Sequence, residues 1–344
     1  METIRITLAV LPLLLLGTDR TALTQTTWDV VTTFQIGGQG GWDYLTPDPQ
    51  THRLYVPRST HTMVIDTQSG KVVADIPGQK GSHGVAIASE FGRGFISDGG
   101  GDGAVVIFDL KTNAVLGSLK TLPDTDGIIY DPNSKLVLVV SGRGKALMTI
   151  KPDIDPKDGK LEEPIPLHGE PEFLTADPSG RAYVNLETTN EVAVIDLKSR
   201  KVVTNWPVAP GGDPVGMAID PTNGRIFIGC RNPQKLIVMS TKNGEVVGDM
   251  PIGPSVDAIK FLDGLAFAST GDSQLSVAGE TAPGKFAILQ TVKTGEGART
   301  MALDPVARRI FLPSAEYEAA PSGGRRSQKP DSFKLIVVGP QTRP

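Results

Sequence analysis

Short apolar runs alternate with turn residues along almost the whole chain, and the runs come in groups of four. The clearest group begins at Gly41 with an apolar stretch that closes on Asp48-Pro49, and three further apolar runs follow at residues 52–56, 62–66 and 71–76. The Asp-Pro marker, or the residue in its place, recurs about every 43 residues, at Asp48, Ser89, Asp131, Asp177, Asp220, Asp263 and Asp304. Four short strands in a repeat of about 40–45 residues are typical of one blade of a β-propeller.

The two ends of the chain complete one another in this pattern. The last group ends on its third apolar run, Lys334–Val338, and the missing fourth run stands near the start, where Asp29–Phe34 copies the pattern of Lys71–Ile76. Pairing the first strand with the last blade would leave no unpaired sheet edge in that blade. The sequence therefore predicts an all-β, seven-bladed β-propeller of four-stranded blades, closed by the N-terminal strand.

The same turn recurs between the third and fourth runs of several groups. An aspartate is followed four residues later by a turn residue in the pairs Asp66 and Gly70, Asp109 and Asn113, and Asp196 and Arg200. The carboxylate can accept hydrogen bonds from the backbone N–H groups that follow it. The later position favours a positive φ, which Gly and Asn adopt at little cost. We therefore interpret these aspartates as structural, and Arg200 as an exception to the expected residue type.

Several of these phrases resemble the repeats of the YncE-like family of YVTN-repeat β-propellers. They are Val64–Val73, Arg181–Asn185 and Val194–Lys198, and the resemblance extends over roughly Trp28 to Val338. It implies a seven-bladed propeller and a secreted or periplasmic location. It implies no particular reaction, because most members of the family have no defined biochemical role.

Composition fits one globular domain with many turns. The 344 residues are 39% hydrophobic and include 39 Gly and 27 Pro. One repeat array covers residues 27–340, which predicts a single propeller domain and a monomer. The formal net charge of −4 provides no basic surface, so no nucleic-acid partner is expected. The single cysteine, Cys230, excludes an intramolecular disulfide.

The first 24 residues carry a targeting pattern. The apolar run from Ile6 to Gly17 is too short to span a bilayer comfortably. We interpret residues 1–24 as a secretory signal peptide and expect a secreted or periplasmic protein. The cleavage position stays open, because Arg20 interrupts the small-residue pattern before Ala22. An uncleaved segment would instead anchor the protein to a membrane.

Polar and aromatic residues stand at the start of each first run. The innermost strands of a propeller line a central channel, so these residues should form a ring at one mouth of that channel. The ring comprises Trp42, Asp43, His83, Asp126, Glu172, Asp213, Asp257 and Arg299, with Glu316 as a further residue at its rim. Carboxylates and an arginine around a concave mouth predict a site for a small polar ligand, in which Arg299 could hold an anion. The structural alternative, left equally open, is that these groups pair with one another.

No catalytic, metal or cofactor motif is recognised in the chain. The four histidines show no paired ligand spacing, and the run Asp98–Gly103 is interpreted as a turn rather than a calcium loop. A binding or scaffold protein, with an unknown small polar ligand or protein partner, is therefore favoured over an enzyme. Two alternatives stay open. One is a lactonase-like or lyase-like enzyme that uses His83, Glu172 and Arg299, and the other is a protein-interaction module that uses the loop Tyr317–Ser332.

Overall fold

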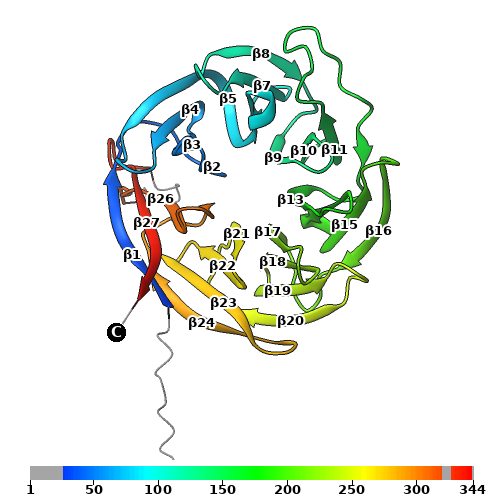
Figure 1. Ribbon diagram of the computed structural model, residues 1–344, viewed down its shortest axis with the longest axis vertical. Helices are drawn as coiled ribbons and strands as arrows, with labels where there is room; N and C mark the ends of the chain where they lie inside the picture. Colours follow the sequence, from blue (N-terminus) through cyan, green and yellow to red (C-terminus); the bar gives the residue numbers. More distant parts are fainter. Residues whose placement is uncertain (1–25, 320–326, 343–344) are drawn as a thin grey trace, which may run out of the picture.

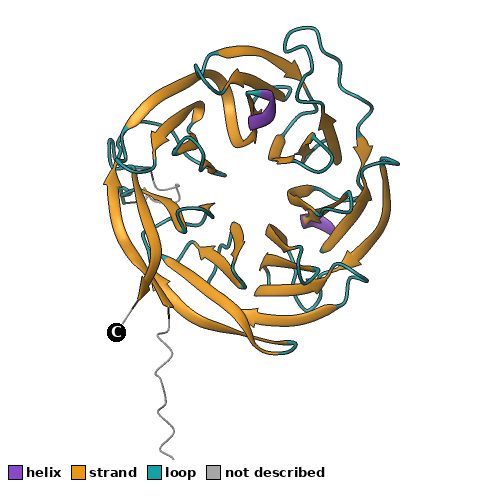
Figure 2. Ribbon diagram, in the orientation of Figure 1, coloured by secondary structure: helices purple, strands orange, loops and turns teal. Residues whose placement is uncertain are grey.

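The computed structural model describes residues 26–319 and 327–342, so the predicted signal peptide lies outside the described residues. The described chain forms six antiparallel sheets arranged as a ring around a common centre (Figure 1). Its regular structure is almost entirely strand, interrupted by two single-turn 3₁₀ helices, Ser89–Phe91 and Glu187–Thr189 (Figure 2). The prediction of an all-β fold is confirmed. In the part of the chain described, no helix is long and apolar enough to cross a membrane.

Four of the sheets each consist of four consecutive strands. The first contains β9 (Thr125–Asp131), β10 (Leu136–Ser141), β11 (Ala146–Ile150) and β12 (Ile165–Pro166). The second contains β13 (Pro171–Ala176), β14 (Arg181–Leu186), β15 (Glu191–Asp196) and β16 (Lys201–Pro207). The third contains β17 (Pro214–Asp220), β18 (Arg225–Arg231), β19 (Gln234–Ser240) and β20 (Val246–Pro251). The fourth contains β21 (Ala258–Leu262), β22 (Leu265–Thr270), β23 (Gln274–Ala282) and β24 (Lys285–Lys293).

A fifth four-stranded sheet joins the two ends of the chain. It contains β25 (Ala302–Asp304), β26 (Arg309–Ser314), β27 (Lys334–Thr342) and β1 (Thr26–Gln35). Strand β1 pairs antiparallel with β27, from Thr26 opposite Thr342 to Gln35 opposite Lys334. The N-terminal strand therefore occupies the outer position that the sequence pattern assigned to it.

The sixth sheet has seven strands, because one long strand belongs to two groups of the repeat. It contains β2 (Thr46–Asp48), β3 (Arg53–Pro57), β4 (Ser59–Asp66), β5 (Val72–Ala88), β6 (Arg93–Asp98), β7 (Ala104–Asp109) and β8 (Val115–Lys120). The first part of β5 pairs mainly with β4 up to Pro77, and its second part pairs with β6 from Ser82 onward. Strand β5 thus runs from the outside of the ring to its centre, where it supplies an innermost strand (Figure 1).

Burial explains why the second and third strands of each group read as continuous apolar runs. Val64 and Ile65 of β4 point to opposite faces of their sheet, and both are buried. Neighbouring sheets cover both faces, so alternation disappears in these strands. Every residue of the outer strand β16 is exposed or half-buried, and polar residues stand among its apolar ones. Apolar clusters fill the space between neighbouring sheets. One cluster brings Trp28 of β1 against Phe267 of β22, with ring centroids 4.7 Å apart.

The predicted turns are confirmed in detail. The Asp66 carboxylate accepts hydrogen bonds from the backbone N–H of Gln68 and of Ser69, and from the Ser69 hydroxyl. Gly70, Asn113 and Arg200 all have a positive φ, between 56° and 71°. Arg200 adopts this left-handed conformation although it is neither Gly nor Asn. Its guanidinium donates to the Thr149 hydroxyl and to a backbone carbonyl, which holds the residue in place.

Candidate functional site

The predicted ring residues lie near the ends of the innermost strands, and these ends share one face of the ring of sheets. His83 of β5 is the centre of one group. Its Nδ1 lies 2.7 Å from Asp43 Oδ2 and 3.5 Å from Asp126 Oδ1, although the two aspartates are 83 positions apart in sequence. All three side chains are partly accessible, with exposed fractions of 31%, 23% and 20% for His83, Asp43 and Asp126. The structure therefore brings three of the predicted residues into direct contact.

The glycine-rich run after β6 makes room for this histidine. The buried Asp98 carboxylate accepts hydrogen bonds from the backbone N–H of Lys80, Gly81 and Gly100, which fixes β5 just before His83. A Cβ on Gly99 would stand only 3.0 Å from His83 Nε2, so a larger residue would push against the imidazole. The prediction that this run is a turn is confirmed, because β6 ends at Asp98 and β7 begins at Ala104.

Asp257 is the centre of a second group. Its Oδ1 lies 2.6 Å from Arg231 Nη2, and its Oδ2 lies 2.9 Å from Arg299 Nε. Arg231 also approaches Glu172, with Nη2 3.9 Å from Glu172 Oε1. The Tyr44 hydroxyl donates to the same Glu172 oxygen at 3.5 Å. Two arginines, two carboxyls and a buried tyrosine thus form one connected network.

Burial and crowded carboxyls shift the pKa of several groups at this mouth. Burial, reinforced by Asp126 and Asp257, raises the pKa of Glu172 to about 9. Burial and the charge of Asp43 also raise the pKa of Asp126 to about 8, against the opposing effect of His83. Burial lowers the pKa of His83, but its hydrogen bond with Asp43 and the charge of Asp126 outweigh that effect and raise it to about 9. At neutral pH the side chains of Glu172, Asp126 and His83 therefore keep protons that they would lose in water.

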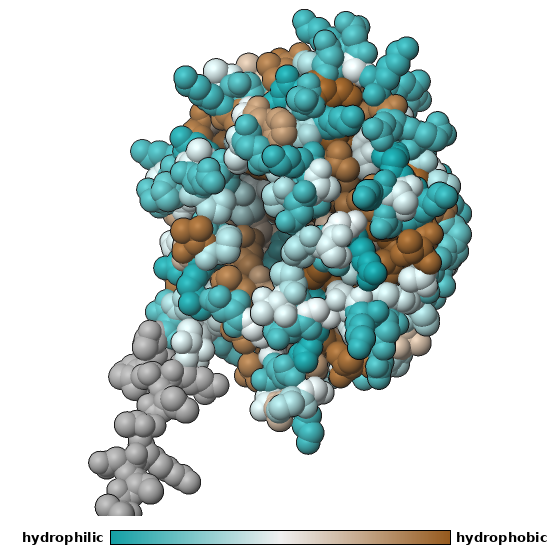
Figure 3. Space-filling view, turned by 45° about the vertical axis from the view of Figure 1, so that its right-hand side comes forward, coloured by the Kyte–Doolittle hydropathy of each residue, from teal (hydrophilic) through white to brown (hydrophobic). Residues whose placement is uncertain are grey.

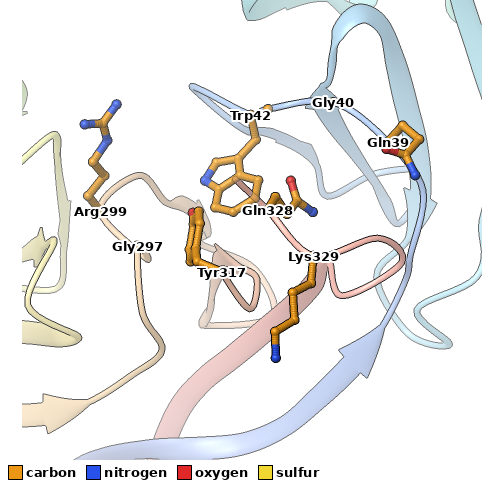
Figure 4. Close-up of a pocket in the computed structure, with 9 residues that line it drawn as sticks. Gln39, Gly40, Trp42, Gly297, Arg299, Tyr317, Gln328 and Lys329 are labelled. Carbon is orange, nitrogen blue, oxygen red and sulfur yellow. The ribbon is translucent and has the colours of Figure 1, made fainter. Parts of the chain in front are cut away.

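A pocket of about 470 Å³ opens beside this network. It is lined by Gln39, Gly40, Gly41, Trp42, Gly297, Arg299, Tyr317, Gln328 and Lys329. These residues come from three separate segments: the loop before β2, the loop before β25, and the loop between β26 and β27. Figure 4 shows the rings of Trp42 and Tyr317 on one side of the pocket, Arg299 across from them, and Lys329 directed away. The space-filling view shows a hollow near the middle of the ring face (Figure 3).

A fully buried arginine shapes one wall of the pocket. Arg58 follows β3 and is 0% exposed. Its guanidinium donates to the carbonyl oxygens of Gly37, Gly38, Gly40 and Gly41, and stacks 3.8 Å from the centre of the Phe333 ring. These bonds hold the loop that carries Trp42. A Cβ on Gly40 would lie 2.4 Å from the Arg58 carbonyl oxygen, so this close approach requires glycine.

Two further predicted residues lie beside these groups. Asp213 reaches the second group through Glu187, because the two carboxyls share a hydrogen bond and Glu187 Oε1 lies 4.0 Å from Arg231 Nη1. The Asp213 backbone N–H donates to Asn190 Oδ1 at 2.6 Å. Glu316 pairs with Lys329 at 3.1 Å, and its side chain is 60% exposed. Glu316 therefore belongs to the rim of the pocket and partly neutralises Lys329. Of the loop Tyr317–Ser332, residues 320–326 lie outside the described residues, and the remainder is joined by a bridge between Tyr317 and Gln328.

The three residues proposed for an enzyme have different partners. His83 contacts Asp43 and Asp126, Glu172 contacts Tyr44 and Arg231, and Arg299 contacts Asp257. Within the described chain, no hydrogen bond or ion pair joins any two of His83, Glu172 and Arg299. Proton transfer to one reacting atom would require at least two of these groups within reach of it.

Sequence reasoning missed Tyr44, Arg58, Arg231 and the pocket residues of the last loop. A signal for Arg231 existed, because the second strand of each group runs antiparallel to the first. The end of the second strand therefore returns to the face where the first strand starts. Asp98, Glu187 and Arg231 all stand at or directly after the end of such a strand. Among the predicted site residues, only Glu316 was selected because it follows the end of a second strand.

Solved structures of similar shape are β-propeller proteins. A chain from a crystal structure of the mitotic checkpoint complex aligns with 98% of this chain and 98% of its own length, at 13% sequence identity and a TM-score of 0.74. Hydrazine synthase from Kuenenia stuttgartiensis aligns with 80% of this chain and 93% of that chain, at 14% identity and a TM-score of 0.68. At these identities the likeness shows the fold alone, and it establishes a β-propeller.

No protein-family model matches the chain, and no curated protein matches its sequence. The YncE-like resemblance therefore stays a prediction. The function has to be argued from the site.

Proposed function

We propose that the protein is a secreted or periplasmic, seven-bladed β-propeller that binds a small anion with a planar apolar body at the channel mouth. The single observation that carries this proposal is the pocket in which Trp42, Tyr317 and Arg299 meet. The three residues come from segments far apart in sequence, and all three line the same cavity of about 470 Å³.

Dividing the seven-stranded sheet at β5 supports the proposed count of seven blades. Its outer part completes the sheet of β2, β3 and β4, and its inner part begins the sheet of β6, β7 and β8. The other five sheets each count as one blade. The pairing of β1 with β27 supports ring closure by the N-terminal strand. The location rests on the pattern in residues 1–24 and on the YncE-like phrases.

Arg299 supplies the charge that would recognise an anion. Its Nε is bonded to Asp257, but its two terminal nitrogens make no other ion pair or hydrogen bond within the described residues. The side chain is 51% exposed, so these nitrogens can reach a ligand. Two parallel N–H donors match the two oxygens of a carboxylate. Asp257 orients the guanidinium and keeps it at the edge of the pocket.

Trp42 and Tyr317 supply an apolar contact for the rest of the ligand. The Trp42 ring packs against Phe333 at 5.3 Å between centroids, which fixes one face of the indole. The Tyr317 hydroxyl approaches Gly297 so closely that a Cβ there would lie 2.8 Å away. Rigid aromatic side chains bind planar ligands at a low cost in conformational entropy. An aromatic carboxylate therefore fits this combination of side chains.

Binding is favoured over chemistry because the titratable groups are already paired. Each carboxyl of the two ring groups lies within 4.0 Å of a histidine or arginine side chain, and the three residues proposed for catalysis have different partners. A ligand in the pocket would contact Arg299 without disturbing those pairs. The protein would then act by holding its ligand.

The proposal predicts that cinnamate raises the melting temperature and that cinnamyl alcohol, its uncharged analogue, does not. A ligand that binds only the folded state at a hundredfold excess over its Kd stabilises that state by about 2.7 kcal/mol. Thermal unfolding of the wild type, Arg299→Gln and Arg308→Gln with each compound measures the effect. Arg308 is the matched control, because it also pairs with an aspartate, Asp263, at 3.2 Å, but lies in the turn after β25.

The shift with cinnamate should disappear in Arg299→Gln and persist in Arg308→Gln. An equal shift with the alcohol, or a full shift in a folded Arg299→Gln protein, would rule out anion recognition by Arg299.

A further inference from the structure

We propose that Asp43, His83 and Asp126 form a binding site for one divalent cation of the first transition row, such as Mn²⁺ or Zn²⁺. The three side chains offer two carboxylate oxygens and one imidazole nitrogen at the channel mouth. These ligand atoms all lie within 4.8 Å of one another. This donor set goes beyond the anion pocket, which uses none of the three residues.

The spacing of the donors suits a shared ion. Two ligands that each lie about 2.1 Å from a metal are separated by about 3.0 to 3.4 Å in octahedral or tetrahedral geometry. His83 Nδ1 lies 2.7 Å from the Asp43 oxygen and 3.5 Å from the Asp126 oxygen. Both His83 distances are within a few tenths of an ångström of that range, and all three ligand atoms lie within 4.8 Å of one another.

Asp126 provides a second observation that points to a missing partner. Its Oδ1 is fully buried and accepts no hydrogen bond within the described residues, although it faces the His83 ring nitrogen at 3.5 Å. A buried oxygen without a hydrogen bond is costly, and folded proteins seldom tolerate one. The hydrogen bond between His83 and Asp43 alone would explain two of the three residues. A cation would bring the oxygens of Asp43 and Asp126 and the same His83 nitrogen onto one centre.

The surroundings of His83 favour coordination through Nδ1. Its Nε2 lies against the backbone at Gly99, where a Cβ would approach within 3.0 Å of Nε2 and of the Thr125 carbonyl oxygen. Nδ1 is the nitrogen that faces the two carboxyls, and the neighbouring Gly99 limits how far the imidazole can turn.

The chemistry of the donors selects the class of ion. One imidazole with two carboxylates is softer than the all-oxygen sites of Ca²⁺ and Mg²⁺, and it contains no thiolate. The side chains are 20% to 31% exposed, so positions toward the channel stay open to water. Three protein ligands with open positions are typical of a site that exchanges its other ligands.

Isothermal titration with MnCl₂ and with ZnCl₂, after treatment with a chelator and dialysis, tests the proposal without any organic ligand. The wild type should bind one equivalent of at least one of these ions. Asp126→Asn and His83→Gln should each weaken that binding by tenfold or more. His168→Gln is the matched control, because His168 also pairs with a carboxylate, Glu191, at 2.5 Å but has no second carboxylate partner among the residues that the structure describes. Its affinity should match that of the wild type.

The proposal is overturned if the wild type binds neither ion, or if binding survives unchanged in Asp126→Asn and His83→Gln. Loss of binding in His168→Gln would also overturn it, because the ion would then lie elsewhere. Circular dichroism shows whether each variant is folded, and Asp43→Asn replaces any variant that is not. The cation site and the anion pocket use different residues, so either can fail while the other stands.

Discussion

Glu172 shows how a single buried side chain can limit the stability of this fold. Its carboxyl lies between Tyr44 and Arg231, and burial with nearby carboxyls raises its pKa from the usual 4.5 to about 9. The folded protein therefore holds a proton that the unfolded chain releases between those two pH values. The stability that this proton contributes is complete below pH 4.5 and is lost as the pH rises toward 9.

Glu172→Gln should therefore stabilise the protein in alkaline but not in acidic solution. Glutamine has the shape of the protonated carboxyl and cannot ionise, so the free energy of unfolding should rise by about 1 to 3 kcal/mol at pH 8. At pH 4.5 the variant and the wild type should be nearly equal. Urea unfolding at the two pH values measures this, with the exposed Glu170→Gln as a control that changes little at either. An equal effect of Glu172→Gln at both pH values would contradict the assigned protonation state.

At this scale the sequence predicted which residues gather at the mouth but not how they pair. Asp43, His83 and Asp126 were all expected there, because each stands at the start of an innermost strand. Their mutual contact depends on side-chain directions and on the space left by Gly99, which no spacing in the sequence reports. Arg231 escaped prediction because it lies at the end of a second strand and reaches the mouth only through the antiparallel return of that strand.

Among the elements, the loop between β1 and β2 depends most on one distant side chain. The Arg58 guanidinium donates hydrogen bonds to four carbonyl oxygens of this loop, and the charged group is fully buried. Burial lowers the pKa of this guanidinium to about 10, although it stays protonated at neutral pH. Ile36, Trp42 and Leu45 pack into an apolar cluster, and the glycine-rich stretch between Ile36 and Trp42 is held by the hydrogen bonds of Arg58, which define the pocket wall.

Arg58→Leu should both destabilise the protein and abolish the cinnamate shift. The substitution leaves buried carbonyl oxygens without donors, which should cost about 2 to 4 kcal/mol. Arg53→Leu is the matched control, because Arg53 begins the strand β3 that Arg58 follows, and it pairs with Asp66 with its side chain 33% exposed. Its loss should cost less than about 1 kcal/mol and leave the shift intact. Chemical unfolding and thermal shifts of both variants measure these effects, and a full cinnamate shift in folded Arg58→Leu would contradict the role given to Arg58.

The elements themselves were largely predictable, because local chemistry determines them. The Asp66 turn follows from one carboxylate and a glycine, and the apolar runs follow from burial between sheets. Strand β5 was not predicted as one element. Its two halves belong to different groups of the repeat, and only the three-dimensional path from the outside of the ring to its centre makes them continuous.

The whole molecule follows from repetition, with its two ends joined in one sheet. The repeat length and the displaced first strand predicted a ring, and similar solved structures establish the propeller fold. The function was not predictable to the same degree. A ring of sheets brings loops from every group to one face, and the residues that meet there are separated by hundreds of positions in sequence.

An experimental structure of the protein grown with cinnamate tests the central claim most directly. The account predicts a ring of seven blades, with the ligand between Trp42 and Tyr317 and its carboxylate on the terminal nitrogens of Arg299. A structure in which cinnamate is bound elsewhere, or in which the pocket stays empty at saturating cinnamate, would contradict the account.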